Sequence, residues 1–290
     1  MELTYISARG ERLPLVSNDL FYLTNIDGQT AAEASIASSA TGGADGVTVN
    51  SVQANPRTLV LDLTVKSGVD VEKAKRAVLK VVKLKQRGSL EWKQNSRTVM
   101  ISGIVERVDM PRWTNAVMMQ ISLHCDQPFW EDAENVIQEI SEAIDLHYFT
   151  DSATDMLYFT EQGMPFGEYN TLRTQDYYND GDVAVGMEIS IVAFETVTNP
   201  IIYDGSGNFL GVGHGSGARQ LVMREGDHLI ITTHRGNKTV KLNGESVIAK
   251  IKPRSTWLQM AAGSNRFTID SDDPSMTNMA FSLIFKQRYV

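Results

Sequence analysis

In the C-terminal part of the chain, short runs of alternating apolar and polar residues are separated by turn residues. This pattern is the feature that most limits the folds the chain can adopt. Runs such as 183-VAVGMEISIVAF-194, 227-DHLIITTHR-235 and 279-MAFSLIFKQRY-289 are separated by turns that contain glycine or asparagine. Short strands with a turn signal at intervals of about 8–12 residues are typical of a β-sandwich. We therefore expect residues 183–290 to form one β-sandwich domain.

The first 130 residues show the same alternation. In 57-RTLVLDLTVK-66 the apolar side chains recur at every second position, so Leu59, Leu61 and Leu63 should share one face of a strand. Similar runs follow at 89–94, 97–110 and 115–125. The sequence predicts a mainly β protein of two β-sandwich domains, the first formed by residues 1–130 and the second by residues 183–290.

One segment of the first domain has the helical period instead. Asp70 suits a helix N-cap, and Val71, Ala74 and Val78 recur after it at helical spacing. Gly88 follows as a stop signal. The spacing predicts one α-helix over about 70–85, whose outer face is basic through Lys73, Lys75, Arg76, Lys80 and Lys83.

Two further segments differ from both domains in composition. Residues 28–46 are small and polar, which suits a long, mobile hairpin arm that projects from the first domain. Residues 131–182 contain 13 acidic residues and one base, Arg173. We interpret residues 131–182 as an acidic connector or insert, which begins with a short helix within 132–146 because its Val and Ile residues stand four positions apart.

The distribution of charge argues against sequence-specific nucleic-acid binding. The net charge is −8; residues 1–130 carry 15 Lys/Arg against 13 Asp/Glu, and residues 131–290 carry 12 against 22. A nucleic-acid binder needs a clustered basic surface that displaces counterions from phosphates. No apolar run approaches the roughly 18–20 residues needed to cross a bilayer, and the first residues lack a signal-peptide pattern, so no membrane partner is expected.

The residue types that carry catalysis form no recognisable motif. Cys125 is the single cysteine, which excludes a disulfide framework and indicates synthesis in a reducing compartment. The five histidines fit no metal-ligand spacing, and His124 and Cys125, as neighbours on a strand, would point to opposite faces. The glycine-rich run 205–217 fits neither a nucleotide loop nor a calcium loop and is explained by hairpin tips. We expect no enzymatic activity, no cofactor and no bound metal.

The segment 255-STWLQMAAGSNRFTI-269 resembles the C-terminal motif of the Dit family of siphophage distal tail proteins, in which an aromatic residue and a leucine precede a Gly-x-Asn turn into a strand. Upstream, 179-NDGDVAVGMEISI-191 and 225-EGDHLIITTHRGNKTVKLNGE-245 are similar to segments of the family's second domain, although Gly186 stands near a place where proline is common. In the first domain, 20-LFYLTNIDG-28, the helix and 126-DQPFW-130 are similar too. The acidic insert is the least similar part.

The residues of the C-terminal motif have a structural use. Trp257 and Leu258 offer a large buried contact at a strand end. Gly263 supplies a backbone conformation that other residues resist, and Asn265 can hydrogen-bond back to its own turn. We expect these four residues to lock one corner of the second sandwich.

The resemblance implies a structural virion protein. Six copies would form a ring at the tail tip or baseplate, joining the tail tube protein to the trimeric tail-associated hub protein after synthesis in the bacterial host cytoplasm. The second, galectin-like domain would hold tail fibres or a receptor-binding protein. Ring closure requires two different surfaces of one subunit to match. The candidates are the 28–46 arm and the basic helix face of Lys73, Arg76, Lys80 and Lys83, with the acidic C-terminal half as the complementary charge.

Two alternatives come from other classes of protein. One is a carbohydrate-binding module, because β-sandwiches often bind sugars through exposed aromatics and the connector contains Tyr148, Tyr158 and Tyr177. The same rings can instead pack against a neighbouring subunit. The other is a baseplate or tube component of a contractile, phage-tail-like particle, in which related ring proteins occur.

Overall fold

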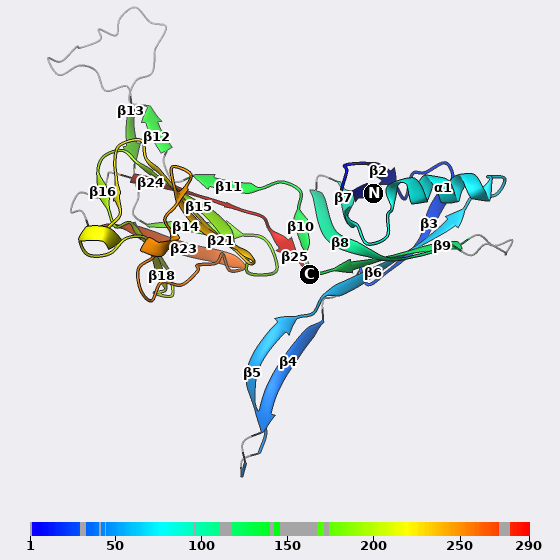
Figure 1. The fold of residues 1–290 in the computed structure, drawn as a ribbon, viewed down its shortest axis with the longest axis horizontal. Coiled ribbons are helices and arrows are strands. Elements are labelled where there is room, and N and C mark those ends of the chain that lie inside the picture. Colours follow the sequence, from blue (N-terminus) through cyan, green and yellow to red (C-terminus); the bar gives the residue numbers. More distant parts are fainter. Residues whose placement is uncertain are drawn as a thin grey trace, which may run out of the picture. The chain divides into compact units, whose positions relative to one another are not determined.

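The computed structural model describes residues 2–29, 33–40, 42–43, 45–95, 97–110, 118–139, 142–145, 167–170, 174–272 and 279–290. The chain divides into two compact units, of which unit 1 contains Met1–Glu134 and Arg288–Val290 and unit 2 contains Asn135–Gln287. Strands dominate both units, which confirms the mainly β prediction (Figure 1). The boundaries differ from the expected ones, because residues 131–134 and the last three residues belong to unit 1 and the rest of the acidic segment is grouped with unit 2.

Unit 1 is built on one antiparallel sheet of nine strands. Its main path runs β2-β1-β7-β8-β9-β6-β3, and β10 pairs with both β8 and β25. The strands are β1 (Glu2–Ser7), β2 (Arg12–Pro14), β3 (Phe21–Asp27), β6 (Arg57–Val65), β7 (Arg87–Gln94), β8 (Arg97–Asp109), β9 (Met118–Cys125), β10 (Trp130–Asp132) and β25 (Arg288–Tyr289).

The core of unit 1 lies between this sheet and the helix α1 (Val71–Val81). Leu59, Leu61 and Leu63 are fully buried on one face of β6, which confirms the predicted strand and its apolar face. Val78 and Val81 of α1 belong to the same buried cluster. Helix and sheet are thus held together by removal of apolar surface from water.

The helix begins where the sequence predicted and ends four residues earlier. The Asp70 side chain accepts a hydrogen bond from the Glu72 backbone nitrogen at 2.9 Å, which is the expected N-cap. The predicted end at residue 85 is wrong because Lys85 adopts a left-handed φ of 64°. Its backbone nitrogen then donates to the Val105 carbonyl at 2.9 Å, so the chain has already joined the sheet.

Gly88 is a strand residue and does not stop the helix. It lies in β7 directly beneath the ring of Tyr5 on β1. A Cβ atom at this position would stand 2.2 Å from the Tyr5 hydroxyl oxygen and 2.5 Å from its Cζ. The absence of a side chain at Gly88 therefore allows Tyr5 to enter the core, where it is 1% exposed.

The end of the chain is fastened to unit 1. Trp130 of β10 is the register partner of Tyr289 of β25. The Arg288 Nε atom donates to Glu131 at 2.7 Å, and the Tyr289 hydroxyl donates to Asp132 at 3.0 Å. The chain consequently leaves unit 1 after Glu134 and returns to the neighbouring strand at Arg288.

The predicted arm is a β-hairpin. It consists of β4 (Ala34–Ala40) and β5 (Val47–Ala54), which pair with each other in a separate two-stranded sheet (Figure 1). The hairpin extends eight residues beyond the predicted end of the arm at residue 46, because Val47 to Ala54 form its second strand.

Unit 2 is a β-sandwich of two antiparallel sheets. The first sheet has the order β11-β24-β15-β20-β21-β22 and the second has the order β14-β23-β17-β18. The first contains β11 (Val136–Glu139), β15 (Met187–Ala193), β20 (His228–His234), β21 (Asn237–Leu242), β22 (Glu245–Ser246) and β24 (Met279–Phe285). The second contains β14 (Thr174–Asn179), β17 (Ile201–Asp204), β18 (Phe209–Gly211) and β23 (Gly263–Asp270).

The core of unit 2 fills the space between the two sheets. β15 and β24 alternate strictly between buried and half-buried residues, as a strand with one face on a core must. Ile189 and Leu283 from the first sheet share a buried cluster with Ile202 and Phe267 from the second. Shorter elements complete the unit: β12 (Glu142–Asp145), β13 (Gly167–Asn170), β16 (Val197–Thr198), β19 (Val222–Met223), η1 (Gly217–Arg219) and η2 (Ile248–Lys250).

The short helix expected within 132–146 is wrong. Its described residues form the end of β10, then β11 and β12. β11 pairs with β24, so that Val136 stands opposite Phe285, almost 150 residues further along the chain. Long-range hydrogen bonds to an existing sheet therefore override the local helical spacing. Within the described residues, no helix is long and apolar enough to span a membrane.

Candidate functional site

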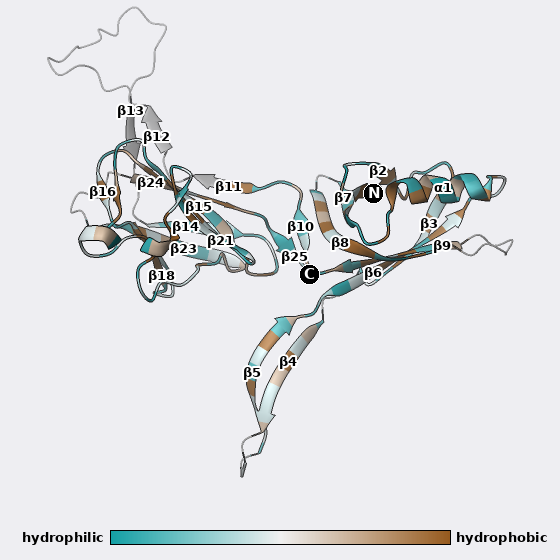
Figure 2. Cartoon of the chain, viewed as in Figure 1, coloured by the Kyte–Doolittle hydropathy of each residue, from teal (hydrophilic) through white to brown (hydrophobic). Residues whose placement is uncertain are grey.

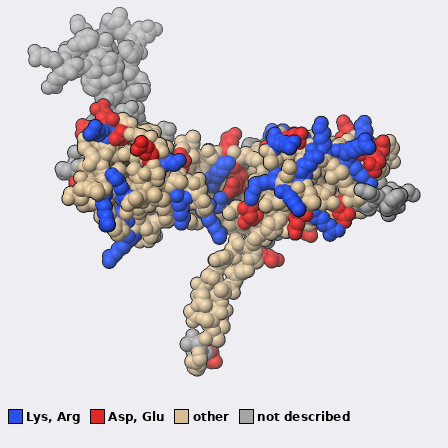
Figure 3. All heavy atoms as spheres, in the orientation of Figure 1, with Lys and Arg blue, Asp and Glu red and all other residues tan. Residues whose placement is uncertain are grey.

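The β4–β5 hairpin exposes apolar side chains along its length. Every described residue of both strands is exposed, and Figure 2 shows apolar positions along the ribbon. Four large side chains are between 55% and 64% exposed: Ile36, Val47, Val49 and Val52. Between residues 33 and 56 the charged residues are Glu33 and Asp45, and Figure 3 shows correspondingly little charge there.

Such a hairpin has no core of its own. An isolated two-stranded ribbon is marginally stable in water, and contiguous exposed apolar surface usually marks a contact with another molecule. The sequence analysis found the arm but missed these side chains, because it ended the arm at residue 46. The alternation of Val47 and Val49 with polar residues, followed by Val52, was the signal of a second strand.

The four basic residues proposed for the helix face are all exposed on or just after α1, over which Lys and Arg atoms gather in Figure 3. Leu79 and Leu84 are exposed among them. The Lys83 ammonium donates to the Leu79 carbonyl oxygen near the helix C-terminus, where a positive charge is favoured. The face combines positive charge with apolar surface, a combination suited to a protein contact.

Lys75 does not belong to this face. It is 7% exposed, and its ammonium nitrogen stands 3.8 Å from a carboxylate oxygen of Glu72. The expectation that Lys75 lines the outer face is therefore wrong. Residue 75 follows the buried Ala74 and stands three positions before the buried Val78, so it lies on the buried side of the helix, where a lysine stem can cover apolar surface.

The C-terminal motif forms a closed corner in unit 2. Gly263 begins β23 with a φ of +84°, a left-handed conformation that favours glycine. The Asn265 side chain accepts from the Ala261 backbone nitrogen at 2.8 Å and donates to the Ala261 and Gly263 carbonyl oxygens at 2.8 and 2.9 Å. Leu258 is buried, and Trp257 packs at the margin of the core beneath Lys238.

A second motif reaches the same corner. Asn179 is 1% exposed, and its amide nitrogen donates to the carbonyl oxygens of Ala261 at 3.2 Å and Val183 at 3.2 Å. Its side-chain oxygen accepts from the Gly181 nitrogen at 3.0 Å. Val185 and Met260 exchange two backbone hydrogen bonds beside it. The segments that begin at Asn179 and at Ser255, recognised separately in the sequence, therefore form one structural unit.

The three tyrosines proposed for sugar or partner contact are not brought together by the described structure. Tyr177 is 2% exposed and packs edge-on against Phe267, with ring centroids 5.8 Å apart, so it is a core residue that a ligand in solvent does not reach. Tyr148 and Tyr158 lie outside the described residues. The next residue, Tyr178, faces the opposite way and is 59% exposed.

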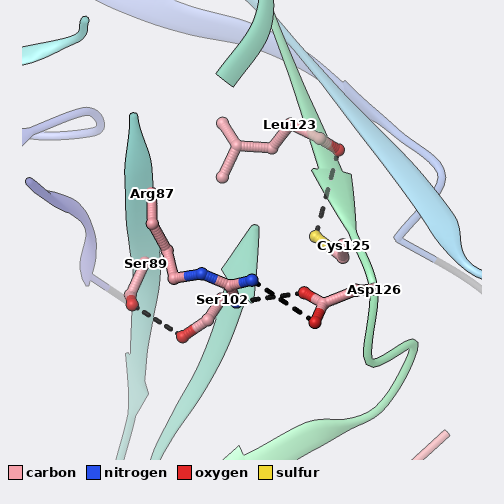
Figure 4. Close-up of polar contacts among 6 residues, drawn as sticks. All are labelled: Arg87, Ser89, Ser102, Leu123, Cys125 and Asp126. Atoms are coloured by element: carbon pink, nitrogen blue, oxygen red, sulfur yellow. Dashed lines mark hydrogen bonds and ion pairs between the residues drawn. The ribbon is translucent and has the colours of Figure 1, made fainter. Parts of the chain in front are cut away.

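Cys125 is a core residue. It is fully buried at the end of β9, and burial raises the pKa of its thiol to about 11. Figure 4 shows its sulfur directed toward the Leu123 carbonyl oxygen, at 3.9 Å. The following residue, Asp126, pairs instead with Arg87 of β7 at 3.0 and 3.4 Å, which lowers the pKa of that carboxyl group.

The described residues offer no metal centre, since no group of three or more His, Cys, Asp or Glu among them could hold an ion. The described residues do form an apolar hairpin surface, a basic helix face and a hydrogen-bonded corner in unit 2. These features are typical of an assembly protein.

Comparisons with known proteins agree with this assessment. Residues 180–289 match the family model of the siphovirus-type tail component, C-terminal domain. The chain aligns with the crystal structure of the Dit protein of phage SPP1 over 99% of both chains, at a TM-score of 0.66 and 12% identity. That protein is described as a paradigm of the hub adsorption apparatus in phages that infect Gram-positive bacteria.

Two structures of the phage P2 baseplate in its activated conformation, one with calcium and one with strontium, align at a TM-score of 0.45 each. They cover 100% and 98% of this chain and 99% and 97% of theirs, with 9% and 10% identity. No curated protein sequence matches the chain.

Residues 180–289 therefore match the C-terminal domain of a siphovirus-type tail component, and the whole chain has the fold of the SPP1 Dit protein. The fold of the whole chain and the match of this segment agree with the resemblance of its motifs to the Dit family.

Proposed function

We propose that this chain is the subunit of a homo-hexameric ring at the distal end of a siphophage tail. There it would join the tail tube protein to the trimeric tail-associated hub protein. The observation that carries the proposal is the Dit fold over 99% of the chain, together with the tail-component match of residues 180–289. The role is architectural and needs neither catalysis nor a cofactor, in keeping with a family of structural tail proteins.

Ring closure would use the β4–β5 hairpin. A cyclic ring requires a heterologous contact, in which one surface of a subunit binds a different surface of the next. The hairpin has large exposed apolar side chains and almost no charge, so it can be buried against a neighbour without desolvating ions. We place its receiving surface on unit 1 of the adjacent subunit, where Met118 and Ile104 are exposed.

The basic helix face would make the second contact. Lys73, Arg76, Lys80 and Lys83 carry positive charge on unit 1, whereas residues 131–290 carry a large acidic excess. Opposite charges across an interface orient the partners and raise the rate of association. Unit 2 would point to the tail exterior and hold fibres or a receptor-binding protein, and the subunits would be made in the bacterial host cytoplasm.

The first experiment measures the mass of the purified chain by light scattering after gel filtration, with negative-stain images of the same fraction. A six-fold ring with a central hole is expected, either for the chain alone or after addition of the tail tube and hub proteins. A chain that stays monomeric with both partners present would overturn the ring proposal.

Variants of the hairpin then test the contact itself. Ile36 and Val52 are register partners across β4 and β5, so Ile36→Lys with Val52→Lys places two charges on the apolar surface. Ser39→Lys with Thr48→Lys is the matched control, because these residues are also register partners on the same hairpin but are already polar. The first pair should abolish rings and leave a folded monomer; equal assembly by both pairs would exclude the apolar contact.

Charge reversal tests the helix face separately. Lys80→Glu with Lys83→Glu should weaken ring assembly, and the wild-type ring should become less stable as salt screens the contact. Assembly that is unchanged by this reversal would remove the helix face from the interface while leaving the hairpin contact in place.

A further inference from the structure

Unit 2 has a polar pocket on the outer face of its four-stranded sheet. The pocket has a volume of about 500 Å³, within the range of about 300–1,000 Å³ found for small-molecule sites. Its wall includes Asp176 of β14 and Ser264 and Arg266 of β23, and its rim includes Ser206 of the β17–β18 turn and Gln259 of the loop before β23. None of these positions figured among the sequence-derived candidates.

Asp176 and Arg266 form an ion pair in the wall of the pocket. Arg266 Nε and Nη2 donate to the two carboxylate oxygens of Asp176 at 2.7 and 2.9 Å, and the two residues are register partners in adjacent strands. Their side chains are 62% and 55% exposed, so the pair contributes little to folding stability. It leaves three of the five guanidinium N–H donors and several carboxylate lone pairs for other groups.

Each charged group of the pocket is hydrogen-bonded within the protein, and two carboxylates against one guanidinium group leave one net negative charge. Arg266 neutralises Asp176, and its hydrogen bonds keep the pKa of that carboxyl group below the usual value. The Asp204 carboxylate accepts from the backbone nitrogens of Ser206 and Asn208 at 2.9 and 2.8 Å and from the Asn208 amide at 2.8 Å. An anion would meet two carboxylates, and a cation would meet the guanidinium group. The arrangement suits an uncharged ligand whose groups both donate and accept hydrogen bonds.

Aromatic rings flank the polar wall on the same face. Tyr178 lies two residues beyond Asp176 on β14, so both side chains point outward, and its register partner is Ser264. On the far side, Tyr203 and Phe209 stand in register on β17 and β18 with ring centroids 6.0 Å apart, and neither is buried. Exposed rings beside planar polar side chains can stack on the C–H face of a sugar ring while its hydroxyl groups are hydrogen-bonded.

We propose that this face of unit 2 binds an uncharged saccharide, with Asp176 and Arg266 contacting vicinal hydroxyl groups and Tyr178 stacking on the ring. The class is a neutral hexose or N-acetylhexosamine unit of a longer polysaccharide. The site is built entirely from residues of the sandwich of unit 2.

The test uses the full chain and a panel of methyl glycosides of glucose, galactose, mannose, rhamnose, N-acetylglucosamine and N-acetylgalactosamine, at millimolar concentration. Binding is measured by saturation-transfer NMR and quantified by titration. At least one member should bind, and glucose 6-phosphate should not. No binding by any member, or preferred binding of the phosphate, would overturn the proposal.

Two variants connect binding to the pocket. Arg266→Ala should weaken binding at least tenfold, whereas Arg107→Ala, which breaks an equally exposed Arg–Asp pair in unit 1, should leave it unchanged. Gly205→Trp should also abolish binding, because residue 205 has an ordinary φ and its Cβ would stand 3.5 Å from the Arg266 Cβ. Thermal unfolding of each variant checks that it is folded. Equal binding by all three variants would contradict the assignment.

Discussion

Asn179 and Asn265 donate hydrogen bonds to the same carbonyl oxygen, that of Ala261, at 3.2 and 2.8 Å. Asn179 ends β14 and Asn265 lies in β23, so one backbone group joins two segments that are 86 residues apart in the sequence. Each amide also closes the turn beside it, Asn179 through Gly181 and Asn265 through Gly263. The corner of the sandwich is therefore specified by polar side chains as well as by apolar packing.

Removal of either amide should destabilise unit 2. Asn179→Ala removes the side-chain acceptor of the buried Gly181 nitrogen and a donor to the Val183 and Ala261 carbonyl oxygens, so we expect a loss of about 1–3 kcal/mol in the free energy of unfolding. Chemical denaturation measures the loss, and the exposed Asn135→Ala is the control. Because Asn179 and Asn265 share an acceptor, the double variant should differ from the sum of the single variants. Strict additivity would mean that the shared carbonyl does not couple them.

A side chain at residue 88 should disturb the core of unit 1. Gly88→Ala forces its Cβ against the ring of Tyr5, and overpacking of this kind costs about 1–3 kcal/mol. Gly42→Ala is the matched control, since a Cβ there meets nothing within 4 Å. Thermal unfolding should separate the two variants. Adding Tyr5→Leu to Gly88→Ala should recover part of the loss, and no recovery would point to a cause other than the clash.

The phenol of Tyr177 should make the protein sensitive to alkali. Burial raises the pKa of this hydroxyl group, which has no hydrogen-bond partner among the described residues. Because the folded-state pKa is raised, the neutral phenol stabilises the fold below the unfolded pKa of about 10, and this contribution is lost as the pH rises above it. Tyr177→Phe should be within about 1 kcal/mol of the wild type at pH 7, or more stable.

Denaturation of both proteins between pH 7 and pH 11 tests this expectation. The wild type should lose stability above pH 10 more steeply than Tyr177→Phe. Some alkaline loss should remain in the variant, because burial also raises the pKa of Tyr5 in unit 1. Identical pH profiles would show that Tyr177 ionises as freely in the folded chain as in the unfolded one.

The thiol of Cys125 should be inert in the folded protein. With a pKa of about 11, only about a thousandth of it is ionised at pH 8, and the thiolate is the reactive form. Reaction with a chromogenic disulfide reagent should therefore be at least about 100-fold slower in the native chain than in denaturant. Rapid native labelling would mean that the end of β9 opens frequently.

Local sequence patterns were sufficient to predict the features that depend on residues close together in the sequence. The N-cap Asp70, the apolar face of β6 and the turn role of Asn265 all follow from neighbouring residues, and the structure shows each of them. The helix expected around Val136 failed because its hydrogen-bond partners lie in β24, which no local window contains. Gly88 was misinterpreted for the same reason, since Tyr5 is remote in sequence.

The candidate site residues show the same difference between features set by nearby residues and features set by distant ones. Exposed basic residues of an amphipathic helix can be inferred from their period. Lys75 is buried, however, which shows that a shift of one position along the helix changes which face a residue lies on. The connector tyrosines could not be sorted from composition, because the burial of Tyr177 and the exposure of Tyr178 depend on which face of β14 meets the core. The wall formed by Asp176 and Arg266 depends on strand register, which the sequence does not reveal.

The return of β25 to pair with β10 makes unit 2 an insertion within unit 1, with its two ends fixed on adjacent strands. A different domain could therefore replace unit 2 if its own termini lie as close together as two paired strands. The remaining sheet, helix and hairpin would keep their connectivity after such an exchange. Unit 2 is thus an exchangeable domain held by unit 1, so evolution could replace its surfaces without redesigning the sheet that holds it.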